Sequence, residues 1–222
     1  MSNQMIVAFK RLGFLKTTST ERKPRRAIPA MFAVDGIGFG VWAAHLPEFK
    51  ASLHLSDGGL SVPLFAAVIG SLIAMPMAGQ AIARVGSRRI VIAAACLYCL
   101  TLPLVATSVL VSWGLIPFTL AAFAFGAFKG AVDVSINAQA VAVERDGPKP
   151  IVSTCHGFWS LGSLTGAGLA ALALKLGLAP IVTMSLVCVL LLTITRFAAS
   201  HLRLDDATAE ESSSSRSSIW PK

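Results

Sequence analysis

Long apolar stretches alternate with short polar connections along most of the chain. Six of these stretches approach or exceed the roughly 20 residues that cross about 30 Å of hydrocarbon at about 1.5 Å per residue. The pattern predicts membrane-spanning helices at 27–46, 60–83, 90–110, 115–143, 152–174 and 179–198. Alternating segments of roughly ten residues, which would indicate a membrane β-barrel, do not occur. We therefore predict an all-α membrane protein with a bundle of six transmembrane helices.

The two ends of the chain differ from this apolar middle. Residues 1–26 become polar and basic after a short apolar patch, and they lack the cleavage site of a secretory signal. We expect a cytosolic arm that sets the topology or lies on anionic lipid. Residues 201–222 are rich in serine and acidic residues, so we expect a disordered cytosolic tail. The chain thus divides into an arm (1–26), a bundle (27–200) and a tail (201–222).

Composition and charge support this interpretation. Hydrophobic residues make up 55% of the chain and charged residues 14%, against about 25% charged residues in soluble domains. Placing the N-terminus in the cytosol puts sixteen of the 19 Lys and Arg residues on that side, as the positive-inside rule requires. We expect both termini in the cytosol. The net charge of +8 is then a topology signal, and nucleic acid is not an expected partner.

An arginine-rich turn separates the second and third predicted helices. Because arginine is costly in hydrocarbon, this turn must lie at an aqueous face. Its arginines can bond helix carbonyls, lipid phosphates or carboxylates of a neighbouring helix, although a plain positive-inside anchor would need the same charges. The residues that we expect to form this conformational loop are Gly79, Arg84, Gly86, Arg88 and Arg89.

Glu144 ends the fourth predicted span on the same side of the membrane. We expect its carboxylate to pair with Arg84, Arg88 or Arg89. The alternative is a solvated loop pair with Arg145, and the sequence alone does not separate the two.

Charged side chains inside predicted spans are functional candidates. Lys129 and Asp133 stand at i and i+4, where they can form an ion pair, and Asn137 follows on a neighbouring part of that face. These residues either wall a polar cavity that binds solute or fasten helices together. Asp35 lies midway along the first span, where a carboxylate is costly unless protonated, paired or hydrated. We expect it to face a cavity as a substrate or proton-coupling site; the alternative is a hydrogen-bonded structural acid.

Two features of the fifth span concern packing. Trp159 lies near its start, where tryptophan often anchors a helix at the membrane interface. Gly162 and Gly166 are four residues apart and form a face of small residues, which favours close approach of another helix.

The arginine-rich turn resembles a signature of the major facilitator superfamily in the loop between its second and third helices. That signature reads Gly, three variable residues, Asp, Arg or Lys, a variable residue, Gly, Arg, and Arg or Lys. The chain matches it at Gly79, Arg84, Gly86 and a basic pair, but has Ala83 in place of the acid. In the family this acid helps to latch one conformational state, so the usual acid of the latch is missing here.

A second resemblance covers residues 27–197. The segments at 42–44, 55–57 and 130–139 resemble the YbjJ-type, fucose-permease-like bacterial permeases. The resemblance implies the N-terminal six-helix half of a carrier in the bacterial inner membrane, which moves a small, sugar-like solute by alternating access. Solute would then bind between two halves, against Asp35, Lys129, Asp133 and Asn137.

A major facilitator carrier has two six-helix halves, and the predicted spans account for one. Three explanations are open: a truncated product, a split carrier with a separate second half, or a half that forms a homodimer. We favour truncation, because the tail has the composition of an interrupted linker. Membrane lipid is the other expected partner.

The main alternative from another class is a membrane scaffold or regulatory protein that is derived from a carrier half and transports nothing. Hydrolase, P-loop and zinc-protease motifs do not occur in the sequence. We therefore expect no enzymatic activity, no cofactor and no metal site.

Overall fold

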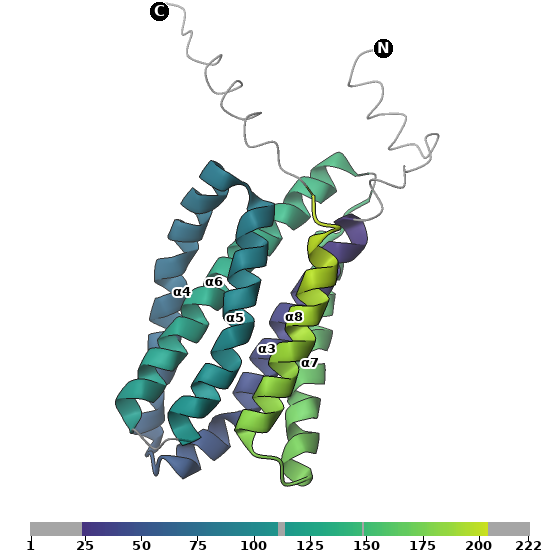
Figure 1. Ribbon diagram of the computed structural model, residues 1–222. Helices are drawn as coiled ribbons and strands as arrows, with labels where there is room; N and C mark the ends of the chain where they lie inside the picture. The colour runs from purple at the N-terminus through teal and green to yellow at the C-terminus, as the bar shows by residue number, and fades with distance from the viewer. Residues whose placement is uncertain (1–23, 111–113, 148, 204–222) are drawn as a thin grey trace, which may run out of the picture.

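The computed structural model describes residues 24–110, 114–147 and 149–203. Within these residues the chain folds into α-helices without strands (Figure 1). The helices are α3 (Pro24–Ser52), α4 (Asp57–Val85), α5 (Ser87–Leu110), α6 (Leu115–Asp146), α7 (Val152–Lys175) and α8 (Pro180–Ala199). All six are long and apolar enough to cross a membrane. The predicted all-α, six-helix membrane fold is confirmed, and it is consistent with one half of a major facilitator fold.

Most helix ends lie within three residues of the predicted ends. The exception is α3, which continues to Ser52 because Pro47 is accommodated inside the helix. Residues 24–26, which we expected in the arm, form the first turn of α3. Residues 1–23 of the expected arm and 204–222 of the expected tail lie outside the described residues.

Short connections join consecutive helices in an up-and-down arrangement. Ser56 caps the start of α4, where its side chain accepts a hydrogen bond from Gly59 N at 3.0 Å. Gly86 alone separates α4 from α5, and its φ of 88° lies in the region that favours glycine. The α4–α5 turn, the end of α6 and the start of α3 lie together at the upper end of the bundle in Figure 1.

Glycines allow two helix pairs to pack backbone against backbone. A Cβ at Gly36 or Gly40 of α3 would lie 2.2 or 2.1 Å from carbonyl oxygens of α7. In return, a Cβ at Gly162 or Gly166 would lie 2.7 or 2.2 Å from carbonyl oxygens of α3, which confirms the predicted small-residue face. Gly126 brings α6 equally close to α4.

Burial is distributed unevenly among the helices. In the most apolar window of α3, 67% of the residues are buried, against 17% in α4 and 22% in α7. Aromatic side chains surround α3, including Tyr98 of α5 and Phe125 of α6, whose rings lie 5.2 Å apart. Helix α3 is therefore the central helix, and its side chains meet α5, α6, α7 and α8 in the core.

Candidate functional site

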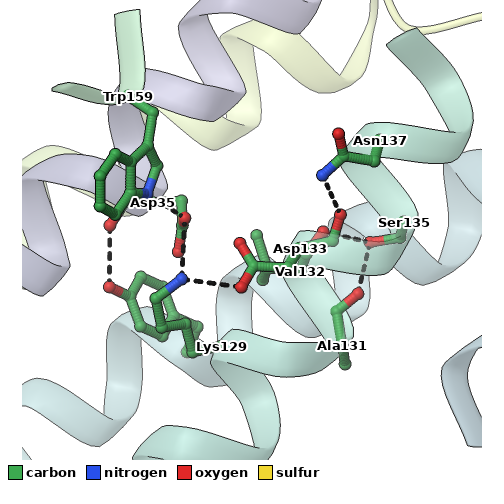
Figure 2. A network of polar contacts seen from close by, with 9 residues as sticks. Asp35, Lys129, Ala131, Val132, Asp133, Ser135, Asn137 and Trp159 are labelled. Atoms are coloured by element: carbon green, nitrogen blue, oxygen red, sulfur yellow. Dashed lines mark hydrogen bonds and ion pairs between the residues drawn. The ribbon is translucent and has the colours of Figure 1, made fainter. Parts of the chain in front are cut away.

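An ion-pair network joins α3 to α6 inside the bundle (Figure 2). Lys129 Nζ lies 2.8 Å from Asp133 Oδ2 and 3.2 Å from Asp35 Oδ2. The predicted i, i+4 pair on α6 is confirmed, and Asp35 is added to it from a position 94 residues away. Figure 2 shows the Lys129 ammonium group between the two carboxylates. Such pairing lowers the cost of charged groups within a membrane helix bundle.

The three charged side chains differ in exposure. Asp35 is fully buried, Lys129 is 15% exposed and Asp133 is 31% exposed. The expected exposure of Asp35 to a cavity is not seen, because packed side chains enclose it. It has the hydrogen-bonded environment of the alternative that we considered, while its role in coupling or binding stays a prediction.

Aromatic residues complete the surroundings of Asp35. Trp159 Nε1 donates a hydrogen bond of 2.6 Å to Asp35 Oδ2, and the Tyr98 hydroxyl donates one of 2.9 Å to the Asp35 backbone carbonyl. The indole N–H of Trp159 therefore points into the bundle, while a role for this residue as an interfacial anchor stays a prediction. The other carboxylate oxygen, Asp35 Oδ1, is buried and has no hydrogen-bond partner among the described residues.

Two aromatic rings lie beside the Lys129 ammonium group. Its Nζ is 5.7 Å from the ring centroids of both Phe39 and Trp159, and these rings are 5.8 Å apart. At such distances the electron-rich ring faces attract a cation. Asn137 takes no part in the ion pairs: its Nδ2 donates to the backbone carbonyl of Asp133 at 2.8 Å, within α6.

The arginine-rich turn is shorter than the sequence pattern suggested. Helix α4 continues through Gly79 and Arg84, and only Gly86 is non-helical. Arg84 and Arg89 are exposed and form no hydrogen bond or ion pair with another described residue. Arg88 behaves differently, because its guanidinium group bonds to α8.

Arg88 ties the start of α5 to the end of α8. Its Nε and one terminal nitrogen donate to the Ala199 carbonyl at 3.1 and 3.0 Å. The last carbonyls of a helix lack partners within that helix, so this bond satisfies one of them. We considered helix carbonyls, lipid phosphates and carboxylates as partners of the turn arginines. The observed partner of Arg88 is a helix carbonyl.

Glu144 caps α7 instead of pairing with the turn. Its Oε2 accepts hydrogen bonds from the backbone N–H groups of Ile151 and Val152 at 2.8 and 3.0 Å. These groups begin α7, where unpaired donors and the helix dipole favour a carboxylate. The expected pairing of Glu144 with Arg84, Arg88 or Arg89 is not found among the described residues.

A polar cluster at the same end of the bundle was not predicted. Gln139 Nε2 donates to Ser87 Oγ at 2.7 Å and to the Arg203 carbonyl at 3.1 Å. Arg203 also forms an ion pair of 2.8 Å with Asp146. Residue 203, which we assigned to the tail, is thus fixed on α6. The sequence feature that could have indicated this cluster is the polar amide of Gln139 near the end of an otherwise apolar helix.

The fold and network define an integral membrane protein with charged residues paired inside its helix bundle. No protein-family model matches the chain. It is 36% identical over 173 residues to an uncharacterized MFS-type transporter of Yersinia pestis, where MFS denotes the major facilitator superfamily. This match covers 77% of the chain and 44% of that relative.

Two further relatives have similar coverage. An uncharacterized transporter of Sinorhizobium fredii, y4wD, is 31% identical over 65% of the chain and 37% of its own length. The membrane protein MosC of Rhizobium meliloti is 30% identical over 70% of the chain and 37% of its own length. The chain spans less than half the length of these relatives. The three relatives that the chain matches are thus named as transporters or as a membrane protein.

Proposed function

We propose that the chain forms one six-helix half of a carrier that moves a small solute across the bacterial inner membrane by alternating access. Both termini then lie in the cytosol, and the carrier is of the fucose-permease-like type. The similarity to MFS-type transporters supports the general activity. The main support for the proposal is the position of the ion-pair network near the middle of the membrane-spanning helices.

Lys129 lies near the middle of its helix. It stands 14 residues beyond Leu115, which is about 21 Å along a 32-residue helix of about 48 Å. Solute sites in carriers of this kind lie near the bilayer midplane. Apolar 18-residue windows in the network helices α3, α6 and α7 also have the lowest mean hydropathies, 1.5, 1.6 and 1.3, whereas those in α4, α5 and α8 have 2.0 to 2.2. These values favour an aqueous path beside the network.

A second six-helix unit would complete the site. Helices α4 and α7 are the least buried, and α4 exposes large apolar side chains such as Phe65 and Leu72. We propose that a second half, or a second copy of this chain, packs against these helices. The network would then lie between the two units and meet solute there.

Uptake into membrane vesicles tests the proposal. The full chain is expressed alone and as a tandem fusion of two copies, and vesicles are assayed with labelled L-fucose, glucose and glucosamine. Lys129→Met removes the shared cation, so uptake is expected to fall at least tenfold. Lys175→Met removes an exposed lysine outside the network and is expected to leave uptake unchanged.

The outcome also decides between transport and the scaffold alternative. If neither form takes up any of the solutes and none of them raises the melting temperature of the purified protein, the transport proposal fails. Equal uptake by the Lys129→Met and wild-type proteins would remove the network from the mechanism.

A further inference from the structure

We propose that Asp133 is the carboxylate that binds the solute, and that the solute is a small organic cation, such as a hydroxylated amine. This inference rests on the proposed function and assigns a substrate class to its site. It follows from the one positive charge that the network lacks and from the partial exposure of Asp133.

The missing charge follows from the ion pairs. Asp35 and Asp133 share a single cation, and Lys129 is the only basic residue that pairs with either of them among the described residues. With all three groups ionised, the network has a formal charge of −1. An uncompensated charge is costly in a low-dielectric interior. A cationic solute removes this cost, whereas an anionic solute increases it.

The class of cation follows from its hydrogen-bond donors. An ammonium group carries three N–H donors, and hydroxyl groups add more. A hydroxylated amine therefore supplies the missing charge together with several donors for the partly exposed Asp133 carboxylate.

The two acids have separate roles because their environments differ. Asp35 is fully buried, and its bond to Lys129 holds α3 against α6. Asp133 is 31% exposed, and its ion-pair partner Lys129 lies on its own helix. An incoming ammonium group can take over Asp133 while Lys129 keeps its bond to Asp35. Asp133 is thus the binding carboxylate, and Asp35 is a positioning residue.

The aromatic rings favour the same class of ligand. Phe39 and Trp159 both lie 5.7 Å from the Lys129 ammonium group, so their faces are already placed to stabilise a cation beside the network. A flat apolar ring face also accommodates the C–H groups of a small polyol.

Matched ligands that differ in charge test the inference. The purified full chain in lipid nanodiscs is titrated with glucosamine, glucose and glucuronate, at a pH where the glucosamine amine is protonated. Ethanolamine, ethylene glycol and glycolate form a second, smaller set. We expect each amine to bind at least tenfold more tightly than its alcohol or acid analogue in calorimetry, and to raise the melting temperature.

Three variants locate the binding group. Asp133→Asn keeps the side-chain volume and removes the charge, so the amine preference is expected to disappear. Asp133→Glu restores the charge and should restore the preference. Asp57→Asn makes the same chemical change at an exposed acid outside the network and should leave binding unchanged.

Several results would overturn the inference: no binding of either amine, binding of an alcohol or acid analogue as tight as that of its amine, or an amine preference that survives Asp133→Asn. The ligand comparison on the wild-type protein does not depend on the folding of any variant. Lys129-dependent uptake of a neutral sugar without amine preference would overturn only this inference. Amine binding without uptake of any solute would overturn only the proposed transport.

Discussion

The hydrogen bond between Trp159 and Asp35 should contribute measurably to stability. Trp159→Phe keeps an aromatic ring and removes the Nε1–H group that lies 2.6 Å from Asp35 Oδ2. Asp35→Ala removes the acceptor. A double-mutant cycle with these two changes cancels the loss of ring packing and the loss of the Lys129 pair, so that the coupling energy reports on the Trp159–Asp35 contact.

The structure sets the expected magnitude. Hydrogen bonds between membrane helices average about 0.6 kcal/mol and reach about 1.7 kcal/mol, while those to charged groups in soluble proteins contribute about 1.5–3 kcal/mol. The Trp159–Asp35 bond is short, and its acceptor is a fully buried carboxyl group. We therefore expect a coupling free energy of about 1.5 kcal/mol, near the upper end of the membrane range.

Reversible unfolding in mixed micelles, followed by far-UV circular dichroism, gives the four free energies of unfolding. Trp42 supplies the control, because its Nε1 is buried but has no hydrogen-bond partner in the part of the chain that the structure describes. The cycle of Trp42→Phe with Asp35→Ala should show coupling near zero. If the two cycles differ by less than about 0.5 kcal/mol, which is the usual error of additivity, the energetic role assigned to the Trp159 bond is refuted.

Three further predictions concern packing and the helix ends. Gly166→Ala should lower the free energy of unfolding by about 1–3 kcal/mol, because its Cβ would overlap the backbone of α3. Gly168→Ala places its Cβ in open space and should not lower the free energy of unfolding. Equal losses in the two variants would contradict the close packing. Arg88→Gln should speed amide hydrogen exchange at the end of α8, whereas Arg89→Gln should leave it unchanged. Equal exchange rates in the two variants would exclude a stabilising role for the bond between Arg88 and the Ala199 carbonyl. Glu144→Ala should cost about 0.5–2 kcal/mol in chemical unfolding through the lost cap of α7, and a neutral result would exclude that cap.

Local rules in the sequence were sufficient for much of the fold. Apolar length located all six helices, because a spanning helix needs about 20 such residues wherever it lies in the chain. The Ser56 cap, the pair of Lys129 with Asp133 and the glycine face of α7 depend on neighbours within four residues. These features were predictable for that reason.

The core of the candidate site depends on contacts between distant parts of the chain. Asp35 meets Lys129 across 94 residues and Trp159 across 124 residues, and no periodicity in the sequence indicates that pairing. Tryptophan near the start of a membrane helix usually indicates an interfacial anchor, so its position did not indicate that Trp159 donates a hydrogen bond to the buried Asp35 carboxylate. Glu144 lies seven residues before Ile151, and the unpaired N–H groups that begin α7 are its partners in place of the expected arginines.

The separation of Asp35 and Lys129 along the chain constrains how the protein is made. At roughly 5–20 residues per second, ribosomes need about 5–20 s to synthesise the 94 residues between them. During that time α3 holds an acid at its centre that costs about 2.5–3.5 kcal/mol in a lone inserted helix. The nascent α3 must therefore enter the bilayer with Asp35 protonated or wait beside the insertion machinery until α6 follows. Assembly of the ion pair is thus a late step in the biogenesis of the bundle.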